Sequence, residues 1–224
     1  MPFDPASTGA VAALEDNPFY RSISTSFGRD IAQRRAALAQ YFAYSIREGQ
    51  QVGRCVRLAD QTRGVAVWLL PQQPDIQAQL ARQKREFLET CLGQAGRSAY
   101  DQILRFMNAK GEAIVDKHAW YLSIVAVDPA VQGKGLGREL LAPTLDEADE
   151  IRAVCYLETF NPRTIPFYER VGFVNAERFH EPTTGAEYTI MVRQRKPLSQ
   201  PSHIELSLDG SAAPSHVPSK ANRY

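Results

Sequence analysis

The stretch VDPAVQGKGLGRELL, residues 127–141, has glycines at three alternate positions, Gly133, Gly135 and Gly137. It follows the apolar run WYLSIVAV, residues 120–127, and leads into leucines that recur at helical spacing. This order predicts a buried strand, a glycine-rich loop and the start of a helix. The loop therefore decides both how the chain folds here and what it can bind.

The glycine loop has the features of an anion site. Glycine adopts positive φ angles easily and lets a ligand approach the backbone closely. The first amides of a helix lack intrahelical partners and attract negative charge. The loop thus predicts a pyrophosphate site formed by the amides from Gln132 to Arg138, with Lys134 adding positive charge. A tight turn that only joins strand and helix is the alternative.

Two common phosphate-binding motifs do not fit this loop. Counted from Gly133, the dinucleotide-binding fingerprint needs a third glycine where Arg138 stands. A phosphate loop of the Gly-Lys-Ser/Thr kind needs a hydroxyl residue where Gly135 follows Lys134. The pattern that remains is Q-x-x-G-x-G, from Gln132 to Gly137, directly after a V-D-P turn.

Composition excludes several classes of protein. The chain has 224 residues, 44% hydrophobic and 23% charged, which is ordinary for one globular domain. A formal net charge of +1 gives no general attraction to nucleic acid or membranes, so neither is an expected partner.

The cysteines and the first residues predict a cytoplasmic protein. Cys55, Cys91 and Cys155 are far apart, with no C-x-x-C motif, so neither disulfides nor a metal site is expected. No apolar stretch reaches the roughly 18 residues of a membrane span. The start, MPFDPASTGA, lacks the features of a signal peptide.

The first third of the chain predicts helices followed by a hairpin. Asn17 before Pro18 fits an N-cap with proline at the first helical position, so a short helix starts there. Apolar residues on one face predict a longer helix over residues 30–50. The segments 52–58 and 65–70, separated by DQTRG, alternate as the two strands of a β-hairpin do.

The rest of the chain predicts a mixed α/β order. Residues 72–117 contain two helical patterns, and the later strands are expected at residues 120–127, 153–158 and 187–194, with a short helix within residues 163–173.

The chain divides into one domain and two flexible ends. Residues 1–16 show no period and predict a flexible N-terminus, and residues 17–197 predict the domain. Residues 198–224 are rich in Ser and Pro and predict a mostly disordered tail, in which only residues 203–208 have a strand-like pattern.

Two strings of sequence resemble a known family. VAVDPAVQGKGLGRELL, residues 125–141, resembles the acetyl-CoA-binding motif of the GNAT superfamily of N-acetyltransferases. YLETFNPRTIPFYERVGF, residues 156–173, is similar to the strand and helix that follow in that superfamily, and most similar to puromycin N-acetyltransferase and its relatives. The resemblance covers residues 118–173. It implies a GNAT fold, with a mostly antiparallel sheet, a central splayed pair of parallel strands and flanking helices.

The resemblance also implies how acetyl-CoA would bind. The pantetheine arm would lie between residues 122–127 and 153–158, which would form the splayed strands. Asn161 would orient the cofactor or the helix after it. The acceptor pocket would be built from the helices of residues 17–48 and 72–110. The implied cofactor-binding residues are Ile124, Val125, Ala126 and Val127 for the arm, and Gln132, Gly133, Lys134, Gly135, Leu136, Gly137 and Arg138 for the pyrophosphate.

Amine attack on a thioester needs a base, an oxyanion site and a proton donor for the thiolate. Tyr168 matches the family's tyrosine near the sulfur and is the expected acid, although it could be a core aromatic beside Phe167. Glu158, at the end of an apolar strand, is the expected base, because burial would raise its pKa. It could instead bind the substrate ammonium or cap the next turn. An amide near Ala126 would hold the oxyanion.

Two further residues have reactive side chains but are not expected to act in the reaction. His118 is titratable, but a lone histidine at a strand end is more often structural or solvated. Cys155 has no histidine partner in the sequence and is expected to pack in the core, so no acyl-cysteine is predicted.

The expected function is direct acetyl transfer from acetyl-CoA to a primary amine of a small molecule. A binding module that holds acyl-CoA without catalysis is the main alternative. A nucleotide-binding oxidoreductase is a third, weakened by the missing third glycine. The resemblance also allows a homodimer.

Overall fold

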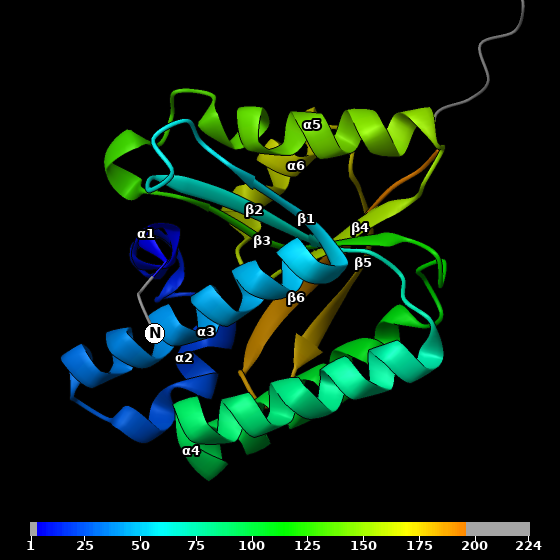
Figure 1. Cartoon of the computed structure of the whole chain (residues 1–224). Coiled ribbons are helices and arrows are strands. Elements are labelled where there is room, and N and C mark those ends of the chain that lie inside the picture. Colours follow the sequence, from blue (N-terminus) through cyan, green and yellow to red (C-terminus); the bar gives the residue numbers. More distant parts are fainter. Residues whose placement is uncertain (1–3, 196–224) are drawn as a thin grey trace, which may run out of the picture.

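The computed structural model describes residues 4–195, in which six strands form a single sheet (Figure 1). The strands are β1 (Gly53–Arg57), β2 (Gly64–Leu69), β3 (Trp120–Val127), β4 (Cys155–Thr159), β5 (Val174–Glu181) and β6 (Ala186–Arg193). Their order is β1-β2-β3-β4-β6-β5. Within the described chain, β3 and β4 pair in parallel and the other neighbours are antiparallel. This confirms the predicted α/β class with a central parallel pair.

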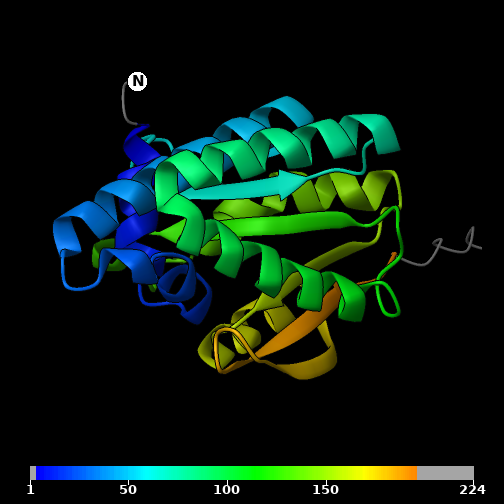
Figure 2. The ribbon, with the colours of Figure 1, turned by 90° about the horizontal axis from the view of Figure 1, so that it is seen from below.

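Helices cover both faces of the sheet, as Figures 1 and 2 show. They are α1 (Pro5–Leu14), α2 (Pro18–Ile23), α3 (Ile31–Val52), α4 (Pro74–Gly111), α5 (Leu136–Glu150) and α6 (Ile165–Arg170), with 3₁₀ turns η1 (Thr25–Phe27), η2 (Pro129–Val131) and η3 (Pro162–Thr164). α5 and α6 share one apolar cluster with the sheet, and α1 to α4 share the other. No helix in residues 4–195 has both the length and the apolarity to cross a bilayer.

The parallel strands separate soon after they meet. The ladder between β3 and β4 contains two register pairs, Trp120 with Cys155 and Tyr121 with Tyr156. Beyond these two pairs, β3 remains paired with β2 as far as Val127, while β4 remains paired with β6. The edge of β3 that faces β4 therefore has no ladder partner after Tyr121 among the described residues. A splayed central pair is what the family resemblance implied.

A β-bulge in β3 changes which side chains face which helices. The register passes from Leu122 opposite Trp68 to Ile124 opposite Val67, which leaves Ser123 as an extra residue. Leu122 accordingly packs in the cluster of α5, and Ile124 packs in the cluster of α1 to α4. The bulge lies directly after the point where the two strands separate.

The prediction of a flexible N-terminus over residues 1–16 is wrong for its described part, which forms α1. This helix packs through small side chains, and Ala6 and Ala10 are each only 1% exposed. A Cβ added at Gly9 would lie 2.7 Å from the carbonyl oxygen of Thr62. Close contact of this kind needs no large apolar residues, so the segment lacks the period by which helices are recognised.

The helices and the hairpin predicted for the first half are confirmed. Asn17 and Asp30 cap α2 and α3 through their side chains, and β1 and β2 form the antiparallel hairpin. The two helical patterns of residues 72–117 are the two arms of α4, which meet at Gly93 in a left-handed conformation (φ 70°). Strand β5 was not predicted, because it lies at the edge of the sheet and most of its side chains are exposed. The tail prediction for residues 198–224, with its strand-like segment 203–208, lies outside the described residues.

Candidate active site

The glycine loop joins the end of β3 to the start of α5. Gly133 and Gly135 adopt left-handed backbone angles, with φ values of 80° and 81°, and no atom lies within 4 Å of a Cβ added at either position. Any residue with a side chain would be strained there. Gln132 ties the loop to the strand, because its Nε2 donates to the carbonyl oxygen of Val127 at 2.8 Å.

The loop presents a run of unused amides. In the described chain, the backbone N–H groups of Gln132 to Gly137 donate to no other backbone group. The predicted run ended one residue later, but the amide of Arg138 donates to the carbonyl oxygen of Gly135 at 2.9 Å. Arg138 could therefore contact an anion only through its exposed side chain, whereas Lys134 offers both its amide and an exposed side chain. Unpaired amides at a helix start fit a bound anion such as a diphosphate.

Gly137 is needed for close packing, whereas the other two glycines are needed for their left-handed backbone angles. A Cβ added there would lie 3.0 Å from two ring atoms of Phe167. The absence of a side chain thus lets the first turn of α5 approach α6, which carries Tyr168 next to Phe167. The loop and the helix of the expected acid are consequently in contact.

Tyr168 is half-buried among aromatic rings. Its ring centroid lies 5.1 Å from that of Phe167 and 6.1 Å from that of Phe173. Burial raises the pKa of Tyr168 to about 12, so the phenol keeps its proton at neutral pH. A charge on Tyr168 would raise the pKa of Tyr20, so the two phenols interact electrostatically.

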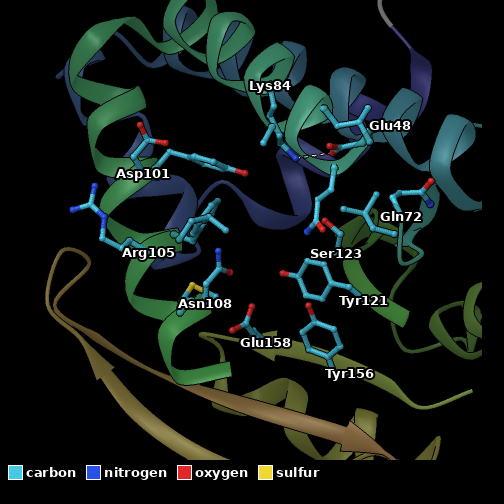
Figure 3. Close-up of a pocket in the computed structure, with 18 of the residues that line it drawn as sticks. Glu48, Gln72, Lys84, Asp101, Arg105, Asn108, Tyr121, Ser123, Tyr156 and Glu158 are labelled. Atoms are coloured by element: carbon cyan, nitrogen blue, oxygen red, sulfur yellow. Dashed lines mark hydrogen bonds and ion pairs between the residues drawn. The ribbon is translucent and has the colours of Figure 1, made fainter. Parts of the chain in front are cut away.

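A cavity of about 770 Å³ lies between the helical layer of α2 to α4 and the β3–β4 pair (Figure 3). It is built from the two helical regions expected to form the acceptor pocket. Tyr20 and Glu158 line it, whereas Tyr168 does not. Its other polar and aromatic lining includes Phe19, Tyr41, Glu48, Lys84, Arg85, Tyr100, Asp101, Arg105, Asn108, Glu112, Lys117, Tyr121, Ser123, Tyr156 and Phe160.

Glu158 lies in this cavity at the end of β4. In Figure 3 its carboxylate lies near the hydroxyl ends of Tyr121 and Tyr156. Burial raises the pKa of Glu158 to about 7, and the Tyr121 hydroxyl opposes part of this increase. The sequence led us to expect this rise in pKa, and the group is thus about half ionised at neutral pH.

A second charged group lies on the other side of the cavity from Glu158. The Nζ of Lys84 on α4 lies 2.6 Å from Oε2 of Glu48 on α3, and the two side chains are only 12% and 10% exposed. Lys84 Nζ also lies about 6 Å from the ring centroids of Tyr41 and Tyr44. Sequence reasoning missed this pair, because its residues are 36 positions apart on two different helices and belong to no motif.

The remaining candidates are not among the residues that line the cavity. His118 is exposed, and its backbone amide donates to Oδ1 of Asp116 at 2.7 Å. Asn161 is also exposed. Its side-chain oxygen accepts a hydrogen bond from the backbone N–H of Arg163 at 3.1 Å and so caps the turn before α6. Cys155 is buried in the core, as expected, and burial raises the pKa of its thiol to about 12.

In residues 4–195, no group of three or more His, Cys, Asp or Glu residues is arranged to hold a metal ion.

Residues 64–173 match the acetyltransferase (GNAT) family. The match runs from the start of β2 to the residue before β5 and includes the glycine loop, Glu158 and Tyr168. It supports the assignment of the chain to the GNAT superfamily.

One curated relative matches a small part of the chain. An uncharacterized protein of Mycobacterium leprae is 36% identical over 72 residues, which are 31% of this chain. The match covers 20% of that protein, so the chain spans about a fifth of its length.

Solved structures share the fold across almost the whole domain. Arylalkylamine N-acetyltransferase 2 from Aedes aegypti has a TM-score of 0.57 at 13% identity, covering 87% of this chain and 94% of that one. A structure from Corynebacterium glutamicum described as histone acetyltransferase HPA2 and related acetyltransferase has a TM-score of 0.56 at 21% identity, covering 88% and 93%. The Drosophila melanogaster polyamine N-acetyltransferase has a TM-score of 0.54 at 12% identity, covering 84% and 92%.

Proposed function

We propose that this chain, whose residues 64–173 match the GNAT acetyltransferase family, transfers an acetyl group directly from acetyl-CoA to a primary amine of a small molecule. One observation carries the proposal. The unpaired amides of Gln132 to Gly137 follow directly on β3, the strand whose edge is left open where it separates from β4. A pantetheine arm needs such an open edge, and a pyrophosphate needs such amides.

The open edge and the loop would hold the two parts of coenzyme A. Backbone groups of Ile124 to Val127 would bond the pantetheine arm, in place of the missing β4 ladder. The loop amides would hold the pyrophosphate, with Lys134 and Arg138 adding positive charge at its exposed side. The carbonyl oxygen of the thioester would accept a hydrogen bond from a backbone amide near Ala126.

Glu158 would act on the amine. A primary ammonium has a pKa near 10, so it must lose a proton before its nitrogen can attack. The Glu158 carboxylate would take that proton, and the nitrogen lone pair would then form the bond to the thioester carbon. Collapse of the tetrahedral intermediate would break the C–S bond and release the thiolate.

Tyr168 would protonate the leaving thiolate. Its pKa of about 12 is above that of a free thiol, which is about 8.5. However, burial raises the pKa of a thiol as well, and that of the Cys155 thiol in the neighbouring core is about 12. A thiolate in an apolar cleft beside Tyr168 would also have a raised pKa, which would bring its proton affinity closer to that of the phenol.

The remaining predictions extend this proposal. We propose that the catalytic domain includes α1, since α1 packs in the same core as α2 to α4. The three cysteines are free, which agrees with a reducing cytoplasm. The string at residues 156–173 makes puromycin one amine to test, because it resembles puromycin N-acetyltransferase.

The experiment is to measure release of the CoA thiol from acetyl-CoA in the presence of a panel of primary amines. At least one amine should accelerate release above the amine-free rate. Tyr168→Phe should lower kcat by about 10²-fold, a typical size for the loss of a proton donor. Tyr44→Phe is the matched control, because Tyr44 does not line the cavity and its ring stacks on that of Phe87 with the centroids 4.4 Å apart. Binding of acetyl-CoA without release by any amine would favour the non-catalytic module instead.

A further inference from the structure

The charges inside the acceptor cavity are not distributed evenly. Glu158 lies at the side of β3 and β4, and the Lys84–Glu48 pair lies on the opposite side in Figure 3. Glu48 is neutralised, because Lys84 Nζ lies 2.6 Å from its carboxylate. Among the described residues of the cavity's inner surface, Glu158 is therefore the carboxylate without a cationic partner.

The other acids that line the cavity offer little to a second cation. Asp101 is bound by two arginines, with contacts of 3.2 Å to Arg85 and 3.0 Å to Arg97. Glu112 is exposed, and the exposed cations Arg105 and Lys117 also line the cavity. The exposed rim thus has more positive than negative charge, which repels polycations.

The walls between these charges are aromatic. The rings of Tyr121 and Tyr156 stack beside Glu158. The ring centroids of Phe19 and Phe160 lie 6.4 Å apart. Burial raises the pKa of all five tyrosines of the lining, so they are neutral phenols: Tyr20, Tyr41, Tyr100, Tyr121 and Tyr156. Such walls favour a flat apolar body and can also face a single ammonium through their rings.

We propose that the acceptor is a primary amine with one positive charge and an aromatic body, and that the buried Lys84–Glu48 pair excludes diamines and polyamines. This inference rests on the proposed transferase function. The ammonium of the substrate would meet Glu158. A second ammonium further along the substrate would find no free carboxylate on the opposite side of the cavity, because Lys84 already occupies the carboxylate of Glu48.

The first test compares amines on the wild-type protein. The rate of CoA-thiol release gives kcat/KM for 2-phenylethylamine, with one charge and one ring, and for putrescine and spermidine, with two and three charges. The kcat/KM for 2-phenylethylamine should exceed the values for putrescine and spermidine by at least about tenfold, a modest value for an ammonium that enters the site without a carboxylate partner. Equal or greater turnover of putrescine would overturn the inference and leave the transferase function intact. Failure of every amine would overturn both.

The second test removes the positive charge of the Lys84–Glu48 pair. Lys84→Gln leaves Glu48 without its cation, which creates a second free carboxylate. The ratio of putrescine to 2-phenylethylamine turnover should rise by about tenfold. The matched control is the double variant Lys84→Gln with Glu48→Gln, which removes both charges. Its ratio of putrescine to 2-phenylethylamine turnover should rise less than that of Lys84→Gln alone. A ratio that does not change in the single variant, shown to be folded by its melting curve and acetyl-CoA binding, would contradict the role of the pair. If the variant does not fold, the wild-type comparison decides.

Discussion

The rings of Tyr121 and Tyr156 stack with their centroids 4.8 Å apart, on the last register pair that joins β3 to β4. The sheet opens directly after this pair. Both side chains line the acceptor cavity, together with Glu158 two residues further along β4. The opening proposed for the thioester therefore adjoins the cavity proposed for the amine.

The pH dependence of turnover tests Glu158 as the base. The pKa of Glu158 is about 7, so kcat/KM should rise as the pH passes through about 7 and the carboxylate forms. Glu158→Gln should lose this inflection and lower kcat by about 10²-fold. If Glu158 only binds the ammonium, the variant will instead raise KM for the amine and leave kcat nearly unchanged.

The stability of the same variant has a pH dependence of known sign. The folded pKa of Glu158, about 7, lies above its usual value of 4.5, so ionisation costs stability as the pH rises from 4.5 to 7. At pH 8 this cost is at most about 3 kcal/mol. Glu158→Gln should therefore raise the free energy of unfolding at pH 8 by about 1–3 kcal/mol, and by far less at pH 4.

Denaturant unfolding at the two pH values measures this difference. Glu187→Gln is the control, because that side chain is 67% exposed and should change stability little at either pH. An equal effect of Glu158→Gln at pH 4 and pH 8 would show that the buried charge is not its source.

The contact between Gly137 and Phe167 can be tested with two substitutions. Gly137→Ala adds a Cβ that would lie 3.0 Å from the Phe167 ring, so this ring must give way by a few tenths of an ångström, and we expect Tyr168 beside it to move as well. The loop amides are retained, so we expect about a tenfold loss of kcat, with a loss of about 1 kcal/mol in stability. Adding Phe167→Leu makes room for the Cβ and should recover part of the lost kcat and part of the lost stability. A double variant no better than the single one would contradict this packing.

The kink of α4 depends on the conformation of Gly93. Its φ of 70° is unfavourable for any residue with a Cβ, although no atom would contact that Cβ. Gly93→Ala should therefore cost about 1–2 kcal/mol of stability. Gly111→Ala is the control, because Gly111 has equal space around it and no positive φ, and it should be neutral or slightly stabilising. Thermal melting of both variants measures the difference.

The local patterns of the sequence predicted the part of the site that the backbone builds. The strand at residues 120–127, the loop of alternate glycines and the helix after it are signalled by periods and by residues with special backbone angles. The first helix was missed because it packs through alanines rather than a stripe of large side chains. Strand β5 was missed because an exposed edge strand needs no apolar alternation.

The part of the site that depends on tertiary contact could not be predicted. The pairing of Lys84 with Glu48 comes from the packing of α4 against α3, and neither residue has a neighbouring signal in the sequence. The role of Glu158 was inferred from its place at the end of a strand, but its burial beside Tyr121 depends on where β3 and β4 separate.

Titration of acetyl-CoA into the full-length protein by calorimetry tests the central claim most directly. Binding by the open β3 edge and by the amides of Gln132 to Gly137 predicts one saturable site per chain. Its Kd should lie between about 1 µM and about 1 mM, the range in which KM values of enzymes for their substrates typically fall. No heat of binding at millimolar acetyl-CoA, with the protein shown to be folded by circular dichroism, would contradict the account.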